Sequence, residues 1–409
     1  MRNMKSLRFV FLIVVLALAV SPVYGQGDDG QVIVPPGETV KIALVTDLTG
    51  PIAPMGVDIQ QAGELAVEEF NADGGVLGEW PIELVVEDDA CSGDQATTVA
   101  SRVVSDPEIV AVAGHSCSGA TSAASDIYED ARLPMVSPSA TATVLATRDL
   151  SVFNRTAPLD ADQGVLDAHY LYKILGVRRL AVLHDNDTYG LGLAEVVQEA
   201  FIELGGEVVA FQGISVTDQD FRPVLTELVP EQPEAIFFGG YQQQAVLLVP
   251  QMADVGLEDV YFFGPDGIFA QAFIDGAGDA GEGVLASFPS LDVGDPERNA
   301  DFDDLYYDTY GLYPEEQGPF HAQSYDATFV LMNAIEAVAE VDDDGNLVID
   351  REALIEAVRT TTEYSGLTGS LTCDEFGNCG TSIFGVYYVQ DGEWVEITGL
   401  EGLLEMEVE

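Results

Sequence analysis

The sequence predicts an α/β protein of two lobes, each a mainly parallel β-sheet flanked by helices, with a ligand cleft between them. Two observations carry this prediction. Apolar strand-like runs alternate with helical patterns almost throughout the chain, and the 409 residues exceed one ordinary hydrophobic core. Ligands of such sheets bind at the carboxyl ends of the strands, so we expect functional residues in the turns that follow them.

Seven short runs are apolar at nearly every position, which is the pattern of parallel strands buried on both faces. They are Lys41–Thr46, Ile82–Glu87, Val110–Ala113, Leu180–His184, Glu207–Phe211, Ala235–Phe238 and Tyr261–Phe263. Two helices are predicted from apolar residues at helical spacing that end at a glycine pair. These patterns are Ile59, Ala62, Ala66 and Phe70 before Gly74-Gly75, and Ala194, Val197, Phe201 and Leu204 before Gly205-Gly206.

The second lobe is predicted to begin after Thr156-Ala157-Pro158, with a helix over Gln163–Leu175. After Ala286 the pattern changes to long helices. These are Arg298–Tyr310 and Phe320–Ala339, followed by an acidic loop at 342–344 and a strand-like segment over Gly369–Gln390.

Residues 1–25 have the pattern of a secretory signal peptide. Arg2, Lys5 and Arg8 precede an apolar core, Phe9–Val20, that is too short to span a bilayer comfortably. No cysteine follows this core, so a lipid anchor is not expected, although an uncleaved membrane anchor remains the alternative. We therefore expect a secreted protein, periplasmic or extracellular.

The charge balance is strongly acidic, with 15 Lys and Arg against 70 Asp and Glu and a net charge of −55. Such a chain would repel phosphates, which excludes nucleic acid as a partner. Adaptation to high salt, where ions screen the repulsion, and an ordinary acidic secreted surface are both compatible with this composition.

Four cysteines, an even number in an oxidising compartment, predict two disulfides. Cys373 and Cys379 can close a tight turn, which leaves Cys91 to join Cys117. The alternative is a zinc site with His115 near Cys117, but the spacings match no common zinc motif. We expect neither a metal nor a cofactor.

Two hydroxyl-rich turns each follow an apolar run and lead towards a helix. The first is GHSCSGA over 114–120 and the second is SPSATA over 137–142. Free N–H groups at a helix start, together with hydroxyls, favour an anion. Neither turn carries Lys or Arg, so a small carboxylate is expected in preference to a polyphosphate.

Enzyme motifs are weak in this chain. The first turn superficially suggests the G-x-S-x-G elbow of hydrolases, with Ser116 as nucleophile, but Gly119 comes three residues later and not two. A secreted serine hydrolase with His321 as base is the alternative from another functional class. Gly190-Leu191-Gly192 lacks the third glycine of a dinucleotide motif. We expect a binding protein, not an enzyme.

Longer segments resemble the leucine/isoleucine/valine-binding proteins of ABC importers, from about Lys41 to at least Ala339. They are GHSCSGATSAASDIYEDARLPMVSPSATA, RTAPLDADQG, RRLAVLHDNDTYGLGLAE, GGY and FFGPDG. The resemblance implies a type I periplasmic-binding fold, a monomeric clamp with three crossovers that closes over one amino acid and docks on a membrane permease. It also implies the pairing of Cys91 with Cys117.

The resemblance further implies the division of the chain. After a linker at 26–40, residues 41–159 and 287–366 form lobe one, and residues 160–286 and 367–409 form lobe two.

The same resemblance implies ligand contacts. On lobe one, Ser118 binds the ligand carboxylate by hydroxyl and N–H, Thr141 gives its N–H to the carboxylate and its hydroxyl to the ammonium, and the Ser139 carbonyl accepts from the ammonium. On lobe two, Tyr241 reaches the carboxylate on closure and Asp266 faces the ammonium. Tyr189 and Phe320 match aromatic cleft positions. Taken alone, Ser118 and Thr141 would fit helix caps and Asp266 a turn residue.

Three positions depart from the family pattern. Asp266 replaces a longer Glu, Met55 stands where an aromatic residue is common, and Ser116 where a leucine lines the side-chain pocket. Cys117 lies in the same turn and is included among the expected contacts. The expected ligand is a branched-chain or other apolar amino acid, and the changed pocket also allows a larger or more polar one. Sensing of another small molecule, such as an amide or a carboxylate, is the alternative.

Overall fold

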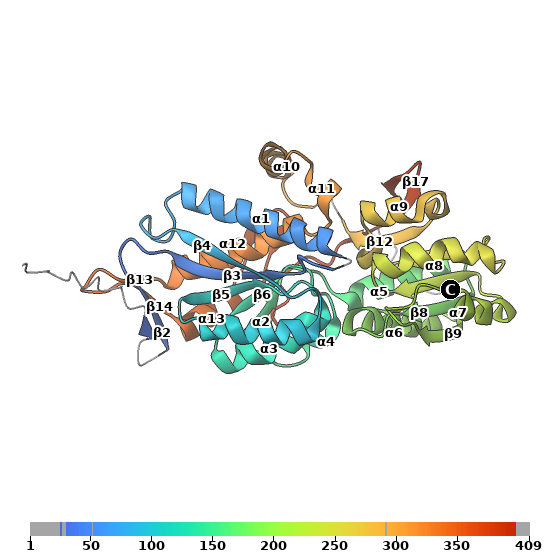
Figure 1. The fold of residues 1–409 in the computed structure, drawn as a ribbon, viewed down its shortest axis with the longest axis horizontal. Coiled ribbons are helices and arrows are strands. Elements are labelled where there is room, and N and C mark those ends of the chain that lie inside the picture. Colours follow the sequence, from blue (N-terminus) through green and yellow to red (C-terminus); the bar gives the residue numbers. More distant parts are fainter. Residues whose placement is uncertain (1–24, 27–29, 51, 291–292, 398–409) are drawn as a thin grey trace, which may run out of the picture.

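The computed structural model describes residues 25–26, 30–50, 52–290 and 293–397. It has two lobes side by side, each a β-sheet with helices on both faces (Figure 1). The signal peptide expected at 1–25 lies outside the described residues except for Gly25. Among the helices of the described ranges, none is both long and apolar enough to cross a membrane.

Lobe one contains a five-stranded parallel sheet in the order β4-β3-β5-β6-β7. The strands are β3 (Val40–Thr46), β4 (Ile82–Asp88), β5 (Ile109–Gly114), β6 (Met135–Ser137) and β7 (Phe153–Arg155). Two packed clusters cover the two faces of this sheet. The helices α1 (Ala53–Ala72), α12 (His321–Val338) and α13 (Arg351–Arg359) contribute to one cluster, and α2 (Gly93–Ser105), α3 (Ser118–Ala131) and α4 (Thr143–Ala146) to the other.

A small four-stranded sheet, in the order β1-β2-β14-β13, corrects the expectation of a linker at 26–40. Its strands are β1 (Gly25–Gln26), β2 (Gln31–Val34), β13 (Glu340–Val341) and β14 (Leu347–Asp350). Val32 and Val34 alternate with partly buried neighbours and enter the lobe-one core beside Leu347. The alternation of burial along β2 is that of a half-buried strand, so this segment belongs to lobe one.

Lobe two contains a seven-stranded sheet in the order β18-β17-β12-β11-β10-β8-β9, in which β17 runs antiparallel to both of its neighbours, β12 and β18, and the other pairs are parallel. The strands are β8 (Arg179–His184), β9 (Glu207–Gly213), β10 (Ala235–Gly239), β11 (Tyr261–Gly264), β12 (Leu285–Pro289), β17 (Phe384–Gln390) and β18 (Glu393–Glu396). One face packs on α5 (Asp160–His169), its π-helical continuation Tyr170–Ile174 and α6 (Thr188–Glu203); the other packs on α7 (Arg222–Leu228), α8 (Gln242–Asp254) and α9 (Gln271–Ala277).

The chain crosses between the lobes three times, after β7, after β12 and before β17. The second crossover leads into α10 (Pro296–Tyr310) and α11 (Pro314–Gln317), which lie above the junction of the lobes in Figure 1. Before the third, a hairpin forms from β15 (Tyr364–Gly366) and β16 (Gly369–Leu371). This arrangement confirms the predicted fold.

Both predicted disulfides are present, Cys91–Cys117 and Cys373–Cys379. The Cys117 sulfur is therefore bonded to Cys91, which removes it as a zinc ligand. His115 is a buried structural residue whose ring contacts the Asp89 carboxylate and the Tyr128 hydroxyl. The zinc interpretation of this turn was wrong, because the Cys117 sulfur and both ring nitrogens of His115 have other partners.

Candidate ligand site

The two hydroxyl-rich turns of lobe one join into a single wall. The Ala142 backbone N–H donates to Ser118 Oγ at 3.2 Å, and the Ser139 hydroxyl donates to the Ser116 carbonyl at 3.0 Å. Ser118, Ser139 and Thr141 are all at most 8% exposed. The turns after β5 and β6 are adjacent because those strands pair in parallel, which places their carboxyl ends together.

Helix α3 begins at Ser118 and has 14 residues. The first N–H groups of a helix have no acceptor within it, and its dipole adds partial positive charge at that end. The Thr141 hydroxyl, buried beside this start, has no hydrogen-bond partner among the described residues. The backbone N–H groups of this wall are therefore neutral donors suited to a carboxylate, and the Thr141 hydroxyl is available to a further polar group.

Arg155 is hydrogen-bonded to the backbone of the second turn. Its guanidinium is fully buried and donates to the carbonyls of Ala140 and Ala142 at 2.9 and 3.0 Å. Its Nε donates to Asn378 in the Cys373–Cys379 loop at 2.8 Å. Two carbonyls of the turn are thus fixed towards the protein interior, and the sequence reasoning missed this role of the arginine in RTAPLDADQG.

Lobe two supplies the opposite wall through Tyr189, Tyr241 and Asp266. The Tyr189 hydroxyl donates to Asp266 Oδ1 at 2.7 Å and accepts from the Gly267 N–H at 3.0 Å. The Tyr189 and Tyr241 rings are 5.1 Å apart between centroids. Burial raises the pKa of Asp266 to about 6, against the opposing effect of the Tyr189 hydrogen bond. Near neutral pH this wall therefore presents a carboxylate, the group that an ammonium requires.

Two further carboxyl groups on α5 were missed by the sequence reasoning. Asp160, Gln163 and Asp167 lie on one face of the helix and are almost fully buried. None of the four Asp160 and Asp167 carboxyl oxygens has a hydrogen-bond partner in the part of the chain that the structure describes. Their spacing of three and four residues was visible in DADQGVLD, as a polar stripe at helical spacing.

These carboxyl groups are shifted towards the neutral form. Burial raises the pKa of Asp160 to about 8, the charge of Asp266 adds to this, and the nearby Thr141 hydroxyl and Arg155 oppose it. Burial also raises the pKa of Asp167 well above its usual range. At neutral pH these two carboxyl groups are therefore mainly protonated, and a cationic ligand group nearby would favour their charged form.

The lobes touch beside these walls. Tyr241 packs against the hydrophobic clusters of both lobes. Gly119, at the start of α3, approaches lobe two so closely that a Cβ there would lie 2.7 Å from an Asp187 carboxylate oxygen. Tyr241 and Gly119 therefore mark where the two lobes contact each other.

A cavity of about 290 Å³ adjoins this contact and includes three expected residues, Met55, Tyr241 and Asp266. Gln242 also lines it, with its Oε1 buried and without a hydrogen-bond partner among the described residues. The volume is near the lower end for small-molecule sites. Met55, one of the departures from the family pattern, thus lines this cavity.

None of the other expected residues lines this cavity. Phe320 packs on Phe288 with centroids 5.7 Å apart, in an aromatic cluster between the lobes. Ser116 donates its hydroxyl to Asp47 and is fully buried. Burial raises the pKa of Asp47 to about 7. Cys117 is buried in its disulfide.

The serine hydrolase interpretation requires Ser116 and His321 to interact as nucleophile and base, and each has other partners. Ser116 directs its hydroxyl to Asp47, whereas His321 Nδ1 contacts the Gly318 carbonyl at 3.1 Å and Asp58 at 3.3 Å. Nucleophile and base must share a hydrogen bond or come close to doing so, and these two residues do neither.

Comparison with known proteins agrees with this architecture. The family model described as periplasmic binding protein matches residues 39–391. A leucine-, isoleucine-, valine-, threonine- and alanine-binding protein of Pseudomonas aeruginosa is 36% identical, covering 86% of this chain and 90% of that protein. The Leu/Ile/Val-binding protein of Escherichia coli is 33% identical over the same shares.

Solved structures give the same result. A leucine binding protein from Thermotoga maritima superposes with a TM-score of 0.78 at 29% identity, covering 88% of this chain and 98% of that one. A branched-chain amino acid transporter substrate binding protein from Streptococcus pneumoniae, in complex with isoleucine, has a TM-score of 0.75 at 26% identity and covers 88% and 100%. This chain belongs to the periplasmic binding protein family, in the group of the Leu/Ile/Val-binding proteins.

Proposed function

We propose that this protein captures a free α-amino acid between its lobes and delivers it to an ABC importer. The observation that carries the proposal is the chemistry of the facing walls. Lobe one offers neutral donors around the start of α3, and lobe two offers the buried carboxyl group of Asp266 beside Tyr189. A zwitterion needs donors at its carboxylate and an anion at its ammonium, which these two walls supply.

The roles that we propose for single residues are those that the family resemblance implies, and this chemistry supports them. Ser118 and the Thr141 N–H hold the carboxylate, while the Thr141 hydroxyl, the Ser139 carbonyl and Asp266 hold the ammonium. Each charge-assisted hydrogen bond of this kind contributes about 1.5–3 kcal/mol. Tyr241, which packs on both lobes, adds a contact to the ligand that exists only when the lobes meet.

The mechanism is a population shift. A ligand that contacts both walls binds the closed clamp more tightly than the open one and so moves the equilibrium towards closure. We infer that a membrane permease recognises the closed form, that the protein acts as a monomer outside the cytoplasm, and that it has no catalytic activity. The names of the relatives make leucine, isoleucine and valine the first ligands to test.

Thermal unfolding against a panel of amino acids, amides and small carboxylates tests the proposal. A ligand that binds only the folded protein stabilises it by about 2.7 kcal/mol at a hundredfold excess over the dissociation constant, so the midpoint rises. We expect the largest rise with branched-chain amino acids and none with the matching carboxylates that lack the amino group. No rise with any amino acid would remove the assignment.

A further inference from the structure

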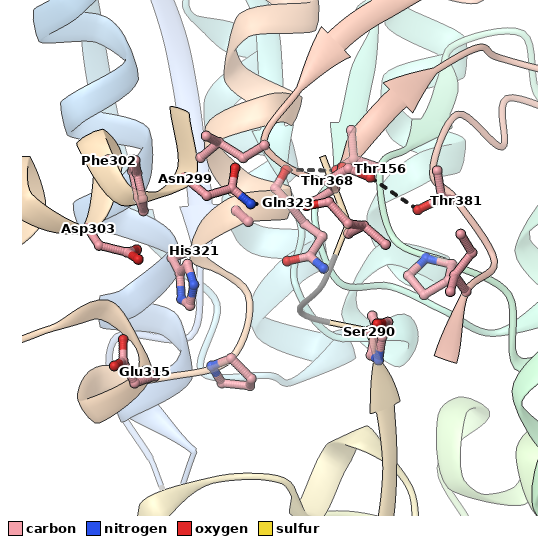
Figure 2. Close-up of a pocket in the computed structure, with 17 residues that line it drawn as sticks. Thr156, Ser290, Asn299, Phe302, Asp303, Glu315, His321, Gln323, Thr368 and Thr381 are labelled. Atoms are coloured by element: carbon pink, nitrogen blue, oxygen red, sulfur yellow. Dashed lines mark hydrogen bonds between the residues drawn. The ribbon is translucent and has the colours of Figure 1, made fainter. Parts of the chain in front are cut away.

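A second cavity lies at the hinge, outside the site described above. Its volume is about 300 Å³, and all three crossovers line it, through Thr156, Ser290 and Thr381 (Figure 2). The remaining lining comes chiefly from α10, α11 and the start of α12. Of its lining residues, only Pro319 is shared with the cavity beside Asp266. The hinge cavity is therefore a separate space.

A buried amide faces this cavity. Gln323 is 6% exposed, and its Oε1 has no hydrogen-bond partner within the described ranges. Its backbone carbonyl accepts from the Thr156 hydroxyl at 2.8 Å, which fixes the residue against the first crossover. Figure 2 shows the amide among the lining side chains. A buried acceptor without a donor is an unusual feature that a ligand's donor would satisfy.

A second acceptor lies on α10. Asn299 donates from Nδ2 to the Val293 carbonyl at 3.0 Å, so its amide orientation is set. Its Oδ1 is buried and, like Gln323 Oε1, lacks a partner among the residues described. Both amides line the same cavity with their oxygens available, so the occupant must bring hydrogen-bond donors.

The charges around the cavity are mostly negative. Asp303 and Glu315 line it, and no Lys or Arg is among its lining residues. His321, the basic group of the lining, is held by Asp58 at 3.3 Å and by the Gly318 carbonyl. Phe302 and other apolar side chains form the rest of the wall. Carboxylates, amide oxygens and apolar surface together favour a cation that carries both N–H donors and carbon.

We propose that the hinge cavity binds a small organic cation with N–H donors on a short apolar stem, such as an alkylguanidinium. Its donors meet Gln323 Oε1 and Asn299 Oδ1, its charge is balanced by Asp303 and Glu315, and its stem lies against Phe302. Because each crossover contributes to the lining, such a ligand contacts the segments that move when the lobes rotate, and its binding is linked to closure.

Isothermal titration calorimetry with n-butylguanidinium chloride tests this site in the secreted form of the whole chain. We expect one-to-one binding at physiological salt and no heat with uncharged n-butanol. Gln323→Leu and Asp303→Asn should each weaken binding about tenfold or more. The matched control is Asp308→Asn, which removes the same charge from an exposed position of α10. Near-ultraviolet circular dichroism establishes that each variant is folded.

Several outcomes would overturn the proposal. No binding at millimolar probe means that the cavity is not a site. Equal weakening in Asp303→Asn and Asp308→Asn means general attraction to an acidic protein. Binding that survives both cavity variants but is lost in Asp266→Asn means that the probe occupies the amino acid site. If Gln323→Leu does not fold, the partly exposed Asp303 still decides between these outcomes.

Discussion

Replacing Asp266 by Asn is the sharpest test of the amino acid site. The substitution keeps the shape of the side chain and an oxygen that can accept from the Tyr189 hydroxyl, which now lies 2.7 Å away. It removes the negative charge that we propose faces the ligand ammonium. Because the residue is only 5% exposed, water cannot replace that charge readily.

The expected magnitude follows from the one interaction that is lost. A hydrogen bond to a charged group contributes about 1.5–3 kcal/mol, and each 1.4 kcal/mol is tenfold in affinity. We therefore expect leucine to bind Asp266→Asn about ten- to a hundredfold more weakly. Stability should change little, and in the direction of a gain, because burial of the carboxylate is itself unfavourable and raises its pKa to about 6.

Calorimetric titration with leucine at pH 7.5 measures the change. The control is Asp259→Asn, the same charge removal at an exposed position of the same lobe, which should leave the dissociation constant unaltered. A change of less than about threefold in Asp266→Asn would refute the ammonium assignment. It would also favour a ligand without an amino group.

Three other predictions concern pH, the buried arginine and the disulfide. Leucine affinity of the unmodified protein should fall as pH drops below about 6, where Asp266 takes up a proton, and this fall should be absent from titrations of Asp266→Asn. Arg155→Met should lower the free energy of unfolding by at least about 3 kcal/mol in urea titrations, because it removes three charged hydrogen bonds and leaves buried carbonyls unsatisfied. Replacing Cys91 and Cys117 together by Ala should cost about 3 kcal/mol by the same assay, since the bridge closes a loop across 26 positions; a loss below about 1 kcal/mol would mean that the unfolded chain is not restrained by it.

The elements predicted best are those with a clear sequence pattern, a continuous apolar run for a strand or a regular helical spacing for a helix. The run Leu180–His184 became β8 with one added residue, and the helix predicted over 298–310 became α10, begun two residues earlier. Asp295 caps that helix by accepting from the N–H groups of Glu297 and Arg298. The shift at its start is the ordinary uncertainty of a helix end.

The strands that were missed have short or mixed sequences. β7 has three residues, too few for any periodicity, and its place is set by pairing with β6. β12 reads Leu-Ala-Ser-Phe-Pro, in which Ser287 and Pro289 interrupt the apolar run. Tertiary pairing, not local propensity, makes these segments strands.

The site was predicted unevenly for a similar reason. Ser118, Thr141, Tyr189 and Asp266 were predicted as ligand contacts through the family resemblance, and the turns that hold two of them also through their position after strands. The carboxyl groups of α5 were overlooked because polar residues on a helix normally face water. Only the packing of α5 against the cleft reveals that Asp160 and Asp167 are buried.

That burial is itself an argument about function. Burial raises the pKa values of Asp160 and Asp167, the charge of Asp266 raises both further, and a folded protein selected for stability alone would replace such groups by apolar ones. Arg155, the nearest guanidinium, already donates to the carbonyls of Ala140 and Ala142. These carboxyl groups are therefore mainly neutral at neutral pH, and a cationic group that enters would favour their charged form. Buried carboxyl groups close to Asp266 depart from the rules of stable packing, and such departures are expected at functional sites.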